Sequence, residues 1–218
     1  MFLHSHPYQP FIPKNATTLI VGTIPPPRFS MGKLLIEDVD FCYGSKFGLL
    51  WPILNNIFDL QLAYQNTQHA IEQRKLFLTK NHIGICDMVE SCERDKIDAS
   101  DLGMKNIKLR GLITYLNQNP SIETILFMGG NSKNGPEYFF RKHLISNNLK
   151  LLLVSKKSPK IHQFQLKRRI IKTVSLISPS NAANRSIGAN PIYKKLKLHN
   201  NTFSTFDFRL LQYKKYFK

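Results

Sequence analysis

The sequence has few cysteines and no long hydrophobic run. Its three cysteines, Cys42, Cys86 and Cys92, are too few for a disulfide framework or a four-thiolate zinc or iron–sulfur site. No apolar stretch reaches the length of a membrane-spanning helix. The first residues, MFLHSHPYQPFIP, contain no charged segment followed by an apolar one, so no signal peptide is expected. We expect reduced cysteines, no membrane partner and a cytoplasmic location.

Acidic residues are also scarce. The chain has 14 Asp and Glu against 31 Lys and Arg, a formal net charge of +17. This excess favours a polyanionic partner, most simply nucleic acid, because Lys and Arg neutralise phosphates and release counterions. The alternative is a basic protein that its charge keeps soluble. Hydrophobic residues make up 42% of the 218 residues, which indicates a folded domain with a substantial core.

Motifs for nucleotide triphosphates and dinucleotides are missing. The segment GGNSKNG (129–135) lacks the Gly-Lys-Ser/Thr ending of a phosphate-binding loop, and no G-x-G-x-x-G follows a strand. The spacing of Asp95, Asp98 and Asp101 fits no standard metal site, and such Ser/Asp clusters usually cap helices. We therefore expect no cofactor and no metal.

Buried strands alternate with helices along the chain. The strand-like runs are TTLIVGT (17–23), IGICDMV (83–89), ETILFMG (123–129), LKLLLVS (149–155) and IKTVSLIS (171–178), each of a length typical of strands covered on both faces. Helical spacing of apolar residues occurs in LLWPILNNIF (49–58), IKLRGLITYL (107–116) and NGPEYFFRKHLI (134–145). This alternation predicts an α/β fold with a mostly parallel sheet. We expect a single domain over 1–218, with its core at about 17–198 and a basic extension at 199–218.

Three of these strands end in loops suited to a ligand. The loops are GTIPPPRFS (22–30), GGNSKNG (129–135) and SPSNAANRSIG (178–188). Such sheets bind ligands beyond the carboxyl ends of their strands, and glycine lets the backbone come close to a ligand. We expect the three loops to converge on one cleft.

The order of these motifs resembles the uracil-DNA glycosylase superfamily. Five segments follow one another over about 17–190: LIVGTIPPPRFS, DVDFCYGSKFGLLWPIL, IGICDMVESCERDKIDASD, ILFMGG and SPSNAANR. The third of these segments is similar to the hypoxanthine-DNA glycosylase branch. The resemblance implies a single-domain three-layer α/β/α fold. It also implies a monofunctional glycosylase that flips a deaminated or modified base out of DNA and hydrolyses its glycosidic bond.

The resemblance also implies a set of site residues. The implied catalytic residues are Asp87, Ser178 and Asn181. The implied base-binding residues are Gly22, Thr23, Ile24, Pro25, Phe41, Tyr43, Phe47, Trp51 and Asp87. The implied DNA-binding residues are Pro26, Asn131, Ser132, Lys133, Ser178, Ser180, Asn181, Asn184, Arg185 and Ile187, with Arg185 to Ile187 as a wedge that fills the gap left by the flipped base.

The sequence departs from the family pattern at three positions. Ile24 stands where many relatives orient water with Asp or Asn, and Leu176 stands where the uracil-excising branch has the histidine that stabilises the base anion. Gly48 falls near an Asn of the hypoxanthine branch. Ordinary uracil excision is therefore disfavoured.

Two residue assignments have structural alternatives. The Asp87 carboxylate can accept from an N–H or amino group on a base edge, or it can cap a helix. Phe41, Tyr43 and Trp51 can stack on a base or belong to the core. Two further functions also stay open: excision of a bulky modified cytosine, such as glucosylated hydroxymethylcytosine of phage DNA in antiviral defence, and non-catalytic DNA binding. We expect a monomer without an obligate protein partner.

Overall fold

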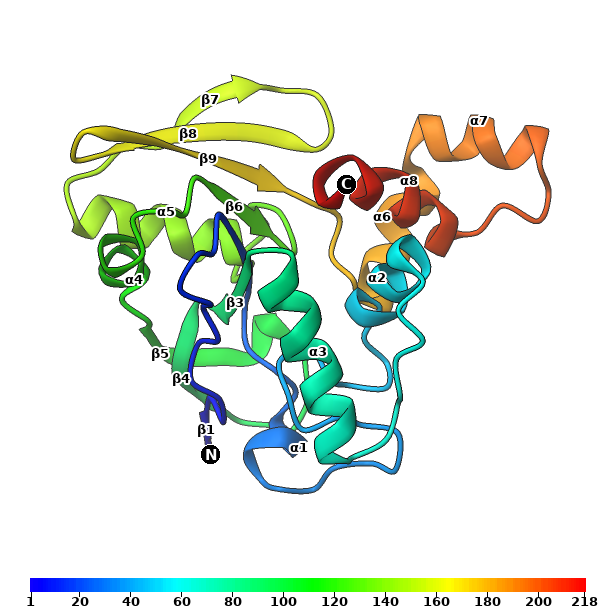
Figure 1. Cartoon of the computed structure of the whole chain (residues 1–218), viewed down its shortest axis with the longest axis horizontal. Coiled ribbons are helices and arrows are strands. Elements are labelled where there is room, and N and C mark those ends of the chain that lie inside the picture. Colours follow the sequence, from blue (N-terminus) through cyan, green and yellow to red (C-terminus); the bar gives the residue numbers. More distant parts are fainter.

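A six-stranded sheet forms the centre of the molecule in the computed structural model, which describes residues 1–218 (Figure 1). Its order is β3-β2-β6-β9-β8-β7. The strands are β2 (Thr18–Gly22), β3 (Ile83–Asp87), β6 (Thr124–Phe127), β7 (Leu152–Ser155), β8 (Lys160–Leu166) and β9 (Arg169–Ser175). The first four strands in this order pair in parallel, and β8 runs antiparallel to both of its neighbours. The predicted α/β fold with a mostly parallel sheet is confirmed.

Helices cover both faces of this sheet. Leu19 and Val21 of β2 belong to one buried cluster with α4 (Leu112–Gln118) and α5 (Pro136–Ser146). Ile20, which points to the opposite face, belongs to a second cluster with three helices. These helices are α2 (Leu50–Phe58), α3 (Gln68–Lys80) and α8 (Thr205–Phe217). The three-layer arrangement is visible in Figure 1.

A second, smaller sheet lies beside the carboxyl end of β3. It has the order β1-β4-β5 and consists of β1 (Phe2–Ser5), β4 (Val89–Arg94) and β5 (Met104–Leu109), all antiparallel. Only Met88 separates β3 from β4. The predicted helix at 107–116 is wrong in its first part, because Leu109 pairs with Val89 in this sheet and α4 begins at Leu112.

The predicted strand at 149–155 exists but is not covered on both faces. It forms β7, the edge of the large sheet, and Leu152, Leu153 and Val154 are 48%, 47% and 57% exposed. The hydrophobic run therefore predicted the strand correctly. Its predicted burial is wrong, because β7 lies at the edge of the sheet and pairs only with β8.

The C-terminal residues belong to the core, contrary to the expected extension at 199–218. They follow α6 (Asn184–Ala189) and α7 (Pro191–His199). The helix α8 begins at a capping box formed by Ser204 and Asp207 and packs on α2. Its residues Phe208, Arg209 and Tyr213 are buried. No helix of the chain combines the length and apolar character needed to cross a membrane.

Candidate functional site

A cavity of about 360 Å³ opens at the carboxyl ends of β2 and β3. Its wall combines the loop after β2, the segment between 43 and 48, the end of β3, the loop before β5 and the loop after β9. The predicted site residues that line it are Gly22, Thr23, Ile24, Pro25, Pro26, Tyr43, Phe47, Asp87, Ser178, Ser180 and Asn181. Two of the three predicted loops therefore meet in one cavity.

The third predicted loop does not reach this cavity. Asn131, Ser132 and Lys133 are exposed and are absent from its wall. Asn134 of the same loop is buried and donates from Nδ2 to the Asp101 carbonyl, 2.9 Å away. The expectation of three converging loops is wrong for 129–135, which supports a wall segment instead of forming one.

Phe41 and Trp51 belong to the core and not to the cavity. Phe41 is 6% exposed and Trp51 1%, and their ring centroids lie 6.2 Å apart. The Trp51 indole donates from Nε1 to the Cys42 carbonyl at 2.9 Å. The prediction that they stack on a base is wrong, since neither ring faces the cavity.

Ile187 cannot fill a gap in DNA in this structure. It lies in α6 and is 1% exposed, whereas Arg185 on the same helix is exposed. The predicted wedge is therefore wrong for Ile187, which is a buried helix residue. Asn184 and Arg185 lie outside the cavity wall, and their contact with DNA stays a prediction.

Asp87 is held at the end of β3 by a histidine from the N-terminal segment. The Asp87 carboxylate is 6% exposed, and its Oδ2 lies 2.8 Å from His6 Nε2. His6 Nδ1 accepts from the backbone N–H of Tyr8, so the ring proton of the neutral histidine is on Nε2 and donates to Asp87. Asp87 Oδ1 makes no hydrogen bond within the protein, which leaves an acceptor for a ligand.

Gly22 allows Asp87 and Tyr43 to approach the end of β2. A Cβ at Gly22 would lie 2.4 Å from Asp87 Oδ1 and 1.9 Å from the Tyr43 hydroxyl. Tyr43 has a φ of 59°, a left-handed conformation that costs about 1–3 kcal/mol for a non-glycine residue. Its hydroxyl is buried without a hydrogen-bond partner. Burial and the nearby Asp87 raise the pKa of Tyr43 well above 10, so this hydroxyl stays protonated.

Asp101 supplies a second carboxylate to the cavity. It begins a short 3-10 helix (Asp101–Gly103), and its Oδ2 accepts from Thr23 Oγ1 at 3.5 Å. Burial is the main cause that raises the pKa of Asp101 to about 6, and the nearby Asp87 also raises it, against the lowering effect of Arg94 and Thr23. Asp101 therefore exchanges its proton near neutral pH, as a general base must.

The loop that carries Asp101 is fixed by the small sheet. Arg94 of β4 is 1% exposed and donates from Nη1 to the Ser100 carbonyl at 2.6 Å. Its Nε donates to His4 Nδ1 at 2.9 Å. Burial is the main cause that lowers the pKa of His4 to about 4, so His4 is neutral and can accept from Arg94. The N-terminal segment thus supports both cavity carboxylates, through His4 of β1 and through His6 just after it.

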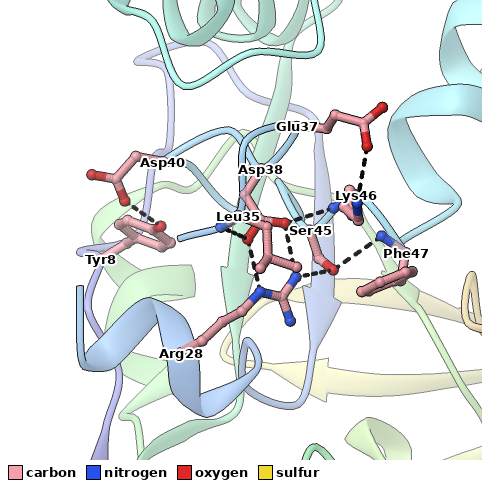
Figure 2. A network of polar contacts seen from close by, with 9 residues as sticks. All are labelled: Tyr8, Arg28, Leu35, Glu37, Asp38, Asp40, Ser45, Lys46 and Phe47. Atoms are coloured by element: carbon pink, nitrogen blue, oxygen red, sulfur yellow. Dashed lines mark hydrogen bonds and ion pairs between the residues drawn. The ribbon is translucent and has the colours of Figure 1, made fainter. Parts of the chain in front are cut away.

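Arg28 is the one permanently charged cation in the cavity wall. It lies in α1 (Pro27–Ser30), and Asp38 and Ser45 hold its guanidinium (Figure 2). The Arg28 carbon Cζ lies 5.7 Å from the centroid of the Phe47 ring. Phe47 is 58% exposed, so its ring is available at the cavity for a stacking partner.

The loop after β9 is shaped by α8. Arg209 is fully buried and donates from Nε to the Ser178 carbonyl at 2.9 Å and from Nη2 to the Ser180 carbonyl at 2.7 Å. The Tyr213 hydroxyl donates to the Ile177 carbonyl at 2.7 Å. These contacts leave the Ser178 side chain free at the cavity wall.

The sequence interpretation missed His6, Arg28, Asp101 and Arg209. Arg28 is the lone charged residue of LIVGTIPPPRFS, and Asp101 is the last residue of IGICDMVESCERDKIDASD; these positions were the available signal. His6 precedes the first recognised strand, and Arg209 lies among the lysines of a basic segment. No sequence pattern distinguishes these two from surface residues. No group of three or more His, Cys, Asp or Glu forms a metal site.

Comparison with known proteins adds one finding about the fold. No family model and no curated protein matches the chain. A solved structure from Methanosarcina acetivorans, determined by solution NMR and named "putative uracil DNA glycosylase", matches with a TM-score of 0.54 at 15% identity. The match covers 95% of this chain and 99% of the other. At this identity the likeness shows that the two chains share a fold.

Proposed function

We propose that the protein is a monofunctional DNA glycosylase that hydrolyses the bond between a flipped base and its deoxyribose. The observation that carries this proposal is the cavity at the carboxyl edge of the sheet, which contains the carboxylates of Asp87 and Asp101 together with the cation of Arg28. Glycosidic cleavage makes the sugar cationic and the base anionic, and such a site offers charge of both signs. The fold shared with a protein named as a glycosylase supports the same reading.

In this proposal Asp101 activates the attacking water, and Asp87 binds the base. Asp101 is ionised above a pKa of about 6, and its carboxylate can then take a proton from the attacking water. Asp87 presents Oδ1 as an acceptor, with His6 bonded to Oδ2. An acceptor at this place favours a base edge that donates, such as a ring N–H or an exocyclic amino group. Ile24 lines the cavity but has no group that orients water.

DNA is the partner that the charge favours. The net charge of +17 suits a phosphate backbone. Ser178, Ser180 and Asn181 lie at the cavity, where hydroxyls and amides can hold the phosphates beside the flipped nucleotide. The same proposal includes DNA contacts by Asn131, Ser132, Lys133, Asn184 and Arg185. It also includes action as a monomer.

A bulky modified cytosine is a second candidate substrate. Three small residues, Gly44, Ser45 and Gly48, line one side of the cavity. Their lack of bulk favours a base with a large substituent, and a cytosine-type base offers Asp87 an amino donor. This substrate class would fit a role in antiviral defence.

The test is incubation with oligonucleotides that each carry one uracil, hypoxanthine, xanthine or modified cytosine, followed by alkaline cleavage at abasic sites. We expect cleavage with at least one base, and its loss in Asp101→Asn. The matched control is Asp59→Asn, since Asp59 is an exposed residue with a φ of 52° that asparagine also adopts. A protein that binds all of these oligonucleotides and forms no abasic site is a non-catalytic DNA binder, which contradicts the proposal.

A further inference from the structure

The cavity contains a cation whose direction is fixed before any ligand binds. Arg28 donates from Nε to Asp38 Oδ2 at 2.7 Å and from Nη2 to Asp38 Oδ1 at 2.8 Å. Nη2 also donates to Ser45 Oγ at 2.8 Å. Nη1 makes no hydrogen bond within the protein, and Figure 2 shows it turned away from Asp38 and Ser45. One edge of the guanidinium is thus anchored, and the other is left for a ligand.

The anchor itself is rigid. Asp38 is fully buried and accepts four donors: two from Arg28, and the backbone N–H groups of Leu35 and Lys46 at 2.8 Å and 2.9 Å. Burial on its own raises the pKa of Asp38, but these hydrogen bonds outweigh it and hold the pKa below its usual value. Asp38 therefore stays ionised, and Arg28 cannot turn without breaking several charge-assisted bonds.

We propose that Arg28 stabilises the negative charge of the departing base, an inference that rests on the proposed glycosylase function. Arg28 is the only permanent cation among the residues that line the cavity, while the carboxylates of Asp87 and Asp101 supply the negative charge there. Leu176, buried and 1% exposed, can give no hydrogen bond to a leaving base. Hydroxyls and an amide in the wall can donate a hydrogen bond, but only Arg28 can donate one and bring a positive charge as well.

The chemistry of this step balances without a cofactor. The bond between the base nitrogen and the sugar carbon breaks, and its electron pair leaves with the base. The negative charge spreads to a carbonyl oxygen of the base, to which Arg28 donates a hydrogen bond from Nη1 while it keeps its proton. Water adds to the sugar carbon and its proton passes to Asp101. The base anion then takes a proton from solvent, and Asp101 returns its proton to solvent.

A DNA phosphate is the other anion that Arg28 can contact. The position of Arg28 favours the base over a phosphate, because its side chain is only 19% exposed. Its Cζ also lies 5.0 Å and 5.7 Å from the centroids of the Phe29 and Phe47 rings. Both anions accept the same hydrogen bond, so the experiment must separate them by chemistry.

The experiment varies the acidity of the leaving base. Single-turnover excision is measured on one oligonucleotide sequence whose target base carries an electron-withdrawing, a neutral or an electron-donating substituent. Arg28→Met keeps the length of the side chain without its charge, and Arg28→Lys keeps the charge without the fork. The control is Arg168→Met, an exposed arginine beside the amino end of β9. Thermal melting checks that each variant is folded.

We expect Arg28→Met to slow excision by about 100-fold or more, as for loss of a donor to a developing anion. The loss should be greatest for the least acidic base, and Arg28→Lys should recover part of it. Arg168→Met should match the parent protein. Equal losses for all bases, with weaker binding and a smaller salt dependence, identify a phosphate contact and overturn the proposal. Unchanged rates in Arg28→Met also overturn it.

A binding measurement separates this inference from the glycosylase proposal. By calorimetry, the parent protein should bind free 5-nitrouracil, an anion at neutral pH, more tightly than uracil, and Arg28→Met should lose this preference. If no oligonucleotide is cleaved but this preference is present, the glycosylase proposal fails and the anion site stands. If the parent protein shows neither cleavage nor the preference, both fail.

Discussion

Gly22 is a residue at which the cavity tolerates little change. An added methyl group at Gly22→Ala would lie 1.9 Å from the Tyr43 hydroxyl and 2.4 Å from Asp87 Oδ1. Both side chains must then shift, so we expect a loss of about 1–3 kcal/mol in the free energy of unfolding together with most of the activity. Urea denaturation and excision rates measure the two effects. Gly188→Ala in α6, which meets no atom within 4 Å, should lower neither stability nor activity, because Ala is the better helix former; equal losses in the two variants would show that Gly22 has no special role.

Asp101 gives the protein a pH dependence of known sign. Its pKa of about 6 lies above the ordinary 3.8, so the folded state binds more protons between these values and the free energy of unfolding falls as pH rises from about 4 to about 6. The fall should be of the order of 2 kcal/mol. Excision should rise over the upper part of this range, as the carboxylate forms. Asp101→Asn should abolish excision and flatten the stability profile, and a free energy of unfolding that still falls from about pH 4 to about pH 6 in this variant would assign the titration to another group.

Asp87→Asn should alter base preference because His6 fixes how the new amide lies. The Nε2–H of His6 donates to position Oδ2, so the amide oxygen should take that place and the NH₂ group should face the cavity. A donor then opposes the donor of the base. We expect the preferred base to lose about tenfold or more in rate, roughly 1.4 kcal/mol. The comparison is Asp98→Asn. The Asp98 carboxylate is half exposed and accepts a hydrogen bond from the backbone N–H of Ser100. Equal excision rates in the two variants would make Asp87 a structural residue.

At the scale of elements, the hydrophobic runs predicted the parallel strands well. β2, β3 and β6 are buried on both faces, so they contain continuous apolar residues that are recognisable without the structure. β1, β4, β5 and β8 were missed because they are antiparallel strands that mix polar and apolar residues. The large sheet could therefore be predicted in outline, and the small sheet could not.

The candidate site was predictable where it follows a buried strand, and Tyr43 and Phe47 were predicted through the family resemblance. The loops after β2 and β9 and the end of β3 were found from their strands. Arg28 is held by Asp38, ten residues further along the chain, and Arg94 binds Ser100 in the loop that carries Asp101. His6 acts on a residue 81 positions away. Pairings of this kind follow from tertiary structure, and no local spacing indicates them.

The helix α8 should control the loop after β9. Arg209→Met removes donors to the carbonyls of Ser178, Ser180 and Thr205. Because buried carbonyls are left without partners, we expect a loss of about 1–3 kcal/mol in the free energy of unfolding, with slower excision at temperatures where the variant is folded. Urea denaturation and single-turnover rates provide the measurement. Arg168→Met is the control, and a variant with normal excision would show that the loop keeps its shape without α8.

At the scale of the whole molecule, the net charge predicts the salt dependence of binding. With +17 charges, the affinity for an unmodified DNA duplex should fall steeply between about 50 and 200 mM salt, because bound cations are released when Lys and Arg replace them. Fluorescence anisotropy with a labelled duplex measures this. An affinity that stays constant over this range would mean that phosphate contacts do not provide the binding.

The central claim is that the cavity hydrolyses a glycosidic bond, and the mass of the DNA tests it most directly. An oligonucleotide with the best base of the panel is incubated with the parent protein, Asp101→Asn and Asp59→Asn, and its intact mass is measured by mass spectrometry. We predict that the parent protein and Asp59→Asn convert it to a product that has lost the base and gained one water, with the sugar still in the chain, while Asp101→Asn leaves it unchanged. An unchanged mass with the parent protein, or equal conversion by Asp101→Asn, would contradict the account.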